Sequence, residues 1–172
     1  ISAGALRLDA PTASLIGRGG DGPIGGPRNN VMKEEAVAKA DHDARSLYLP
    51  IARNVPPEIL AVFDLPDASG VNGEREVTNV PSQALFLMNS DFVAKQSRRL
   101  TERLLSAYPG AAQEKLTERF TLACRLTLGR GPDEIELAAA RKLLAGKTGD
   151  AATAWTSVAR ALLASAEFRY LN

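Results

Sequence analysis

Four amphipathic stretches fill the second half of the chain and restrict its fold more than any other feature. They run from Asp91 to about Tyr108, from about Ala112 to Leu128, from Pro132 to about Leu144 and from about Ala151 to about Ala164. In each, apolar residues recur every three or four positions, which is typical of a helix that buries one face. Glycine and proline lie between the stretches and end each helix. The sequence therefore predicts an all-α fold, an irregular helical bundle of about four main helices.

The apolar faces of these stretches predict the core of the bundle. Their inward positions are Val93, Ser97, Leu100, Leu104, Tyr108, Leu116, Phe120, Ala123, Cys124, Thr127, Trp155, Val158, Ala159, Leu162 and Leu163. Cys124 is the only cysteine, so no disulfide can form within the chain. Its place on an apolar stripe, with no second cysteine or histidine nearby to activate it, predicts a buried and unreactive thiol.

The first part of the chain predicts loops. Residues 17–28 hold six glycines and two prolines, too little apolar surface to offset the entropy of ordering. Gly17-Arg18-Gly19-Gly20-Asp21-Gly22 matches the dinucleotide-binding pattern formally, but Pro23 follows where that motif needs a helix. We therefore expect one domain over 1–172, with residues 1–44 loop-rich and partly flexible and residues 45–172 forming the helical core. With no initiator methionine at residue 1, we interpret the chain as the C-terminal fragment of a larger protein.

Composition excludes several classes of partner. The formal net charge is +1, and basic and acidic residues alternate along the helices, so no basic patch for nucleic acid is expected. No run of 18 apolar residues occurs, which argues against insertion into a membrane. No Cys-x-x-Cys-His motif is present to attach haem, and we expect no cofactor.

The stretch from Asp64 to Asn89 mixes polar and apolar residues more than a plain loop or helix would. Thr78 or Asn79 can cap a helix whose first turn holds Pro81, with Gln83 able to reach back. The run 84–88 is apolar on all sides and is expected to be buried. One alternative is a glycan- or anion-binding site built on the 64–79 loop. Its candidate ligand-binding residues are Arg53, Asp64, Asp67, Arg75, Thr78, Asn79, Gln83 and Asn89.

Catalytic and metal-binding interpretations of the same stretch are weaker. A carboxylate pair of Asp64 and Asp67, joined by His42, is a hydrolase alternative, but a spacing of three residues fixes neither their separation nor a raised pKa. The oxygen-rich loop after Asp64 lacks the spacing of an EF-hand, and its side chains serve equally well in turns. His42 lies between two aspartates that point away from it on a helix, which makes a poor chelator. We therefore assign no catalytic residue and no metal site.

Several motifs, in order along the chain, resemble one protein family. They are Arg45-Ser46-Leu47-Tyr48-Leu49-Pro50, Phe63-Asp64-Leu65-Pro66-Asp67, the run from Val77 to Asn89, Leu128-Gly129-Arg130-Gly131-Pro132 with Glu134, and the run from Ala164 to Tyr170. The family is the C-terminal domain of unknown function in large exported planctomycete proteins, linked to planctomycete-type cytochrome c domains. The resemblance covers about residues 1–172, apart from gaps in the glycine-rich region.

The resemblance implies an exported, extracytoplasmic and multi-domain setting without an assigned activity, and it carries over no catalytic residue. We expect a non-catalytic helical module whose partners are other domains of the same full-length chain. The ligand-binding module and the Asp64/Asp67 hydrolase remain the two alternatives.

Overall fold

A computed structural model describes residues 1–9, 43, 45–48, 58–65, 81–111, 114–146 and 150–169. The chain divides into two compact units. The first unit comprises Ile1–Ala5 and Ala84–Asn172, and the second comprises Leu6–Gln83. The glycine-rich run 17–28 and most of the predicted loop-rich region lie outside the described residues, and the expectation of one domain stays a prediction.

Every regular element among the described residues is a helix, which confirms the predicted all-α class. The second unit holds the 3-10 helix η1 (Ser46–Tyr48) and the short helix α3 (Glu58–Val62). A backbone bond from the Arg7 amide to the Asp43 carbonyl, 2.7 Å long, also lies within it.

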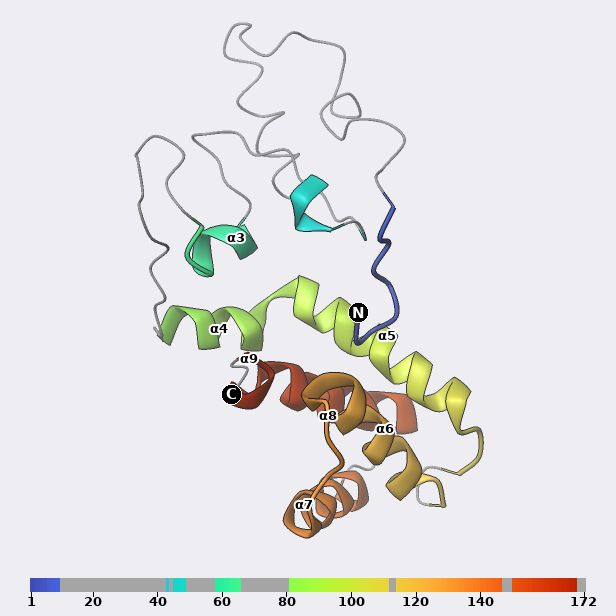
Figure 1. Ribbon diagram of the computed structural model, residues 1–172. Coiled ribbons are helices and arrows are strands. Elements are labelled where there is room, and N and C mark those ends of the chain that lie inside the picture. The colour runs from blue at the N-terminus through green and yellow to red at the C-terminus, as the bar shows by residue number, and fades with distance from the viewer. Residues whose placement is uncertain are drawn as a thin grey trace, which may run out of the picture. The chain divides into compact units, whose positions relative to one another are not determined.

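The first unit contains the four main helices that the sequence predicts. They are α5 (Asp91–Ala107), α6 (Leu116–Leu128), α7 (Glu134–Ala145) and α8 (Ala151–Ala164). The shorter helix α4 (Pro81–Asn89), whose first three residues belong to the second unit, precedes α5, and the four-residue helix α9 (Ala166–Arg169) follows α8. Figure 1 shows α5 running alongside α8, with α6 and α7 completing the bundle, and α5 and α8 share its most extensive contact.

Local sequence explains where these helices begin and end. Ser90 caps α5 by accepting a bond from the Phe92 amide at 3.2 Å. Gly129 ends α6 in the left-handed conformation, with a φ of 75°, which glycine adopts without strain. The second main helix was expected from about Ala112, but α6 begins at Leu116, after a turn at residues 114–115.

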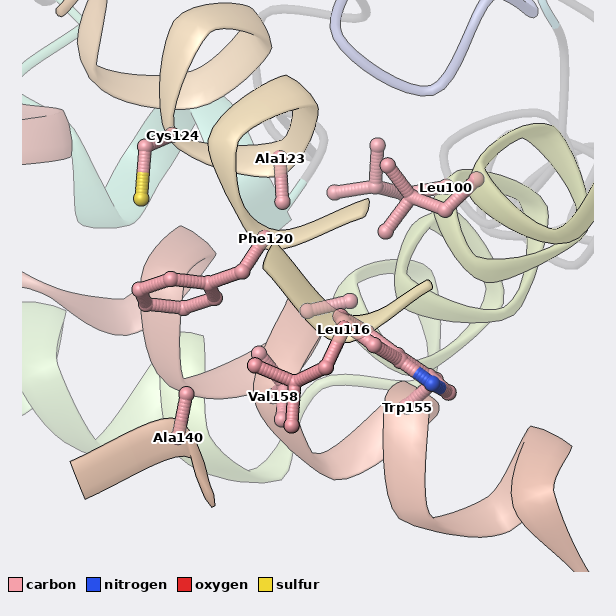
Figure 2. Packing of buried hydrophobic residues seen from close by; sticks show 10 residues of the cluster. Leu100, Leu116, Phe120, Ala123, Cys124, Ala140, Trp155 and Val158 are labelled. Atoms are coloured by element: carbon pink, nitrogen blue, oxygen red, sulfur yellow. The ribbon is translucent and has the colours of Figure 1, made fainter. Parts of the chain in front are cut away.

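The core of the first unit lies where α5, α6, α7 and α8 meet (Figure 2). Its buried cluster is Leu100, Leu104, Leu116, Phe120, Ala123, Cys124, Ala140, Trp155, Val158 and Ala159. Nine of these ten were predicted to point inward, and Ala140 is the addition. Trp155 and Cys124 are completely buried, so the predicted burial of the lone cysteine is confirmed.

Two buried hydroxyl groups on α5 are satisfied inside their own helix. Ser97 Oγ donates to the Val93 carbonyl at 2.7 Å, and Thr101 Oγ1 donates to the Ser97 carbonyl at 3.0 Å. Both residues are at most 2% exposed. Because each hydroxyl uses its proton on the preceding turn, neither needs a polar partner on a neighbouring helix.

Two expected burials are wrong. The run 84–88 was expected to be buried on all sides, but Leu85 is 57% and Met88 58% exposed, while Leu87 is buried. An apolar composition does not decide how much of a short helix is covered; packing on its neighbours does. Tyr108 was expected to point inward, yet it follows the last residue of α5 and is exposed.

Candidate functional site

Three of the eight candidate ligand-binding residues lie in the described part of the chain: Asp64, Gln83 and Asn89. The other five, Arg53, Asp67, Arg75, Thr78 and Asn79, lie outside it, as does His42. Asn89 is the exposed last residue of α4 and belongs to the first unit, whereas Asp64 and Gln83 belong to the second. The ligand-binding set as a whole therefore stays a prediction.

Asp64 ends helix α3 with a backbone conformation that glycine usually supplies. Its φ is 58°, and the amide of Leu65 donates to the carbonyl of Leu60 at 3.0 Å. This six-to-one bond around a left-handed residue is the Schellman ending of a helix. Aspartate tolerates the left-handed region better than most residues, so the local role of Asp64 is structural.

Gln83 provides a polar contact for Asp64 from within the same unit. Its Nε2 donates to Asp64 Oδ2 at 3.4 Å, and Gln83 itself is only 3% exposed. The predicted reach of Gln83 back to a cap at Thr78 or Asn79 stays a prediction, because both cap residues lie outside the described part of the chain. The bond to Asp64 is a contact that the sequence does not indicate. The contact joins the end of α3 to the start of α4 across 19 residues of sequence.

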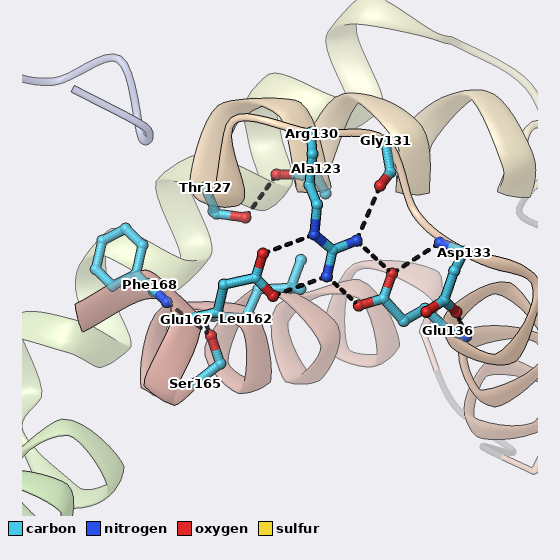
Figure 3. A network of polar contacts seen from close by, with 10 residues as sticks. All are labelled: Ala123, Thr127, Arg130, Gly131, Asp133, Glu136, Leu162, Ser165, Glu167 and Phe168. Atoms are coloured by element: carbon cyan, nitrogen blue, oxygen red, sulfur yellow. Dashed lines mark hydrogen bonds and ion pairs between the residues drawn. The ribbon is translucent and has the colours of Figure 1, made fainter. Parts of the chain in front are cut away.

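The densest polar cluster of the described residues surrounds Arg130, between α6 and α7 (Figure 3). Arg130 donates from Nη1 and Nη2 to the two carboxylate oxygens of Glu136, at 2.9 and 2.7 Å. It donates from Nε and Nη2 to the two oxygens of Glu167, at 2.6 and 2.7 Å. Nη1 also reaches the Gly131 carbonyl at 2.9 Å. A guanidinium has five N–H donors, and these five contacts use all of them.

Glu136 has a second task in this cluster. Asp133 caps α7 by accepting from the Glu136 amide at 2.7 Å, and Glu136 Oε2 accepts from the Asp133 amide at 2.8 Å. This reciprocal pair is a capping box. The guanidinium of Arg130 and the capping box of α7 thus hold the connection from Gly129 to Glu136, and this connection sets the direction of α7 relative to α6.

The cluster shifts the protonation of its carboxyl groups. The hydrogen bonds from Arg130 hold the pKa of Glu136 and of Glu167 below their usual value. The two carboxylates in turn raise the pKa of Arg130, so all three groups are charged at neutral pH. Because the side chains are between 29% and 42% exposed, water and salt weaken the attraction.

Cys124 is buried in α6, and its thiol is held protonated. Burial raises its pKa to about 11, and the negative charge of Glu136 contributes in the same direction. A thiol with this pKa is almost entirely neutral at pH 7, so it has neither the charge of a nucleophile nor that of a metal ligand. The predicted lack of reactivity therefore has a physical basis.

Arg119 is a buried cation that sequence reasoning missed. It is 2% exposed and donates to two carbonyls beyond the end of α5. Nε and Nη2 reach the Tyr108 carbonyl at 3.0 and 2.6 Å, and Nη2 reaches the Gly110 carbonyl at 2.9 Å. Its Cζ lies 5.9 Å from the ring centroid of Trp155. The available signal was its spacing, because Arg119 lies three residues after Leu116 and four before Ala123 on the apolar stripe of α6.

The described residues hold neither a cluster of metal ligands nor a membrane-spanning helix. Among them, no three or more histidine, cysteine, aspartate and glutamate side chains gather as metal ligands. Nor does any helix in these ranges have the length and apolar character needed to cross a membrane.

Comparison with known proteins identifies the family. No curated protein and no solved structure matches the chain. The PSD1 family model, described as a protein of unknown function (DUF1553), matches residues 12–144. The match spans the Asp64–Asn89 stretch and helices α4 to α6, takes in α7 up to residue 144, and stops before α8 and α9. Because it covers well over half of the sequence, the chain belongs to the PSD1 family of proteins of unknown function.

Proposed function

We propose that this chain is a non-catalytic helical module of a large exported multi-domain protein, in which it packs against or orients other domains of the same polypeptide. The observation that supports this best is that the charged side chains around Arg130 bind to one another within the bundle. All five donors of Arg130 are spent on intramolecular acceptors, and its two carboxylate partners tie α7 and α9 to the end of α6. Side chains committed in this way stabilise a scaffold.

The other polar features of the described residues fit the same role. Asp64 shapes a helix end and accepts from Gln83, and Arg119 holds the link between α5 and α6. Membership of a family without an assigned activity agrees with the proposal.

The wider setting rests on the sequence motifs. They resemble the C-terminal domains of exported planctomycete proteins linked to cytochrome c domains. On that resemblance we propose an extracytoplasmic location and a polypeptide that carries further domains, one of which can hold haem.

An activity assay and a binding assay together test the proposal. The purified chain, incubated with a panel of polysaccharides and sulfated glycans, is expected to release no product. Co-expression with the remaining domains of its full-length protein is expected to give a complex that co-elutes in size-exclusion chromatography. Product release that disappears in Asp64→Asn would overturn the proposal and favour the hydrolase. Asparagine also tolerates a positive φ at this position, so the fold is expected to survive that change.

A further inference from the structure

Helix α7 lies at the edge of the bundle and carries apolar residues on its outward face (Figure 1). It contacts α6 and α8, and its Leu137 and Leu144 pack against the buried cluster. Away from them, Ile135 is 81% and Leu143 37% exposed, and the exposed Ala139 lies between the two, about one helical turn from each. In no other helix of the described residues is a large apolar side chain as exposed as Ile135. An apolar stripe of this kind is typical of a helix face that packs against another helix.

Unpaired charges flank the stripe at its two ends. Glu134 begins α7, whereas Arg141 and Lys142 lie near its end. Within the part of the chain that the structure describes, none of these three side chains forms an ion pair or a hydrogen bond, whereas Glu136 is bound to Arg130. About two helical turns separate Glu134 from Arg141, so the two lie along the same edge of the helix.

This order of charges selects the direction of a partner helix. An acidic start and a basic end are complementary to the same helix running the opposite way, and like charges would meet in a parallel pair. We propose that the outward face of α7 pairs antiparallel with α7 of a second copy of this chain. A two-fold axis near Ala139 brings Ile135 of each copy against Leu143 of the other. It also places Glu134 of each copy beside Arg141 and Lys142 of the other, so each charge contact forms twice.

The size of α7 makes this dimer a weak one. The helix has 12 residues and is therefore about 18 Å long. A single helix pair of that length covers less than the roughly 1,200 Å² of a stable interface. We expect a dissociation constant on the order of 0.1 mM, as in transient contacts. This self-association does not depend on the packing against other domains proposed above.

Sedimentation equilibrium of the whole chain, from about 10 μM to 1 mM, measures the dimer. Ile135→Lys replaces an apolar contact by a charge in both copies, so it is expected to raise the dissociation constant at least about thirtyfold. Leu85→Lys is the matched control, because it places the same charge at another apolar residue, 57% exposed on α4. It is expected to leave the dissociation constant unchanged. Both positions are exposed, and unchanged helical circular dichroism shows that each variant is folded.

A charge swap distinguishes this pairing from non-specific association. Glu134→Arg sets like charges against each other twice and is expected to weaken the dimer about tenfold. Adding Arg141→Glu to the same chain restores opposite charges along that edge, and most of the lost affinity is expected to return. A chain that is monomeric at every concentration would overturn the proposal. So would a dimer that Ile135→Lys leaves intact, or one that the swap fails to restore.

Discussion

Replacing Arg119 by methionine tests whether this buried cation makes a net contribution to the free energy of unfolding. Methionine fills nearly the same volume but leaves the Tyr108 and Gly110 carbonyls without their donor. An orphaned buried carbonyl costs about 1–3 kcal/mol. Both residues are exposed, so water can reach the carbonyls in part and the lower end of that range applies to each. Loss of the contact with Trp155 adds about 0.5 kcal/mol.

The methionine variant also avoids the desolvation cost of burying the guanidinium, and this difference favours the variant. Replacement of buried charges by apolar residues can be neutral or even stabilising. Arg119, however, is bound to carbonyls at a helix C-terminus, where the helix dipole favours a positive charge. We therefore expect a net loss of about 2 kcal/mol in the free energy of unfolding for Arg119→Met.

Urea denaturation followed by tryptophan fluorescence measures this loss. Trp155 is the only tryptophan and is completely buried, so its emission reports the folded core directly. Arg125→Met, an exposed arginine on the same helix, is the matched control and should change stability by less than about 0.5 kcal/mol. If Arg119→Met were as stable as the unmodified chain, the carbonyl bonds would not outweigh the cost of burying the cation, and the reasoning would be refuted.

Three further predictions concern the α6–α7 end. Gly129→Ala is expected to lower the urea midpoint by an amount equivalent to about 1 kcal/mol; nothing lies within 4 Å of the added methyl group, so backbone strain is the cause, and Gly129→Asn should cost less. Because the pKa of Glu136 and of Glu167 is lowered in the folded state, their contribution to the free energy of unfolding is complete above the unfolded pKa of about 4.3 and is lost as pH falls through the folded pKa. Urea midpoints measured from pH 6 to pH 2 are therefore expected to fall below about pH 4.5, and to fall less in Arg130→Gln. Cys124 is expected to react with a thiol reagent at pH 8 only after urea unfolds the chain; rapid reaction in the native state would contradict its burial and its pKa of about 11.

The sequence predicts the helices of the bundle well because their signals are local. The apolar spacing of α5, α6 and α8 identifies most of the core, and Gly129 and Asp133 mark the adjoining helix ends. These features depend on neighbours three or four residues away, which a single sequence displays directly.

The polar clusters could not be predicted in the same way. Arg130 and Glu167 belong to two separate family motifs, but nothing local indicates that they meet across 37 residues. Arg119 resembles a surface arginine until its carbonyl partners are known. For the candidate ligand-binding set, the contact between Asp64 and Gln83 likewise joins residues 19 apart. Long-range pairing of polar side chains depends on how the helices pack, which periodicity alone does not determine.

The self-satisfied hydroxyls of α5 have a consequence for how this family can vary. Since Ser97 and Thr101 bond to their own helix, neither hydroxyl has a proton left to offer to a neighbouring helix. To the neighbouring helix, serine at position 97 is therefore nearly equivalent to alanine. We therefore expect Ser97→Ala to need no compensating change on the helices around α5, so position 97 can change polarity while the packing of the bundle is preserved.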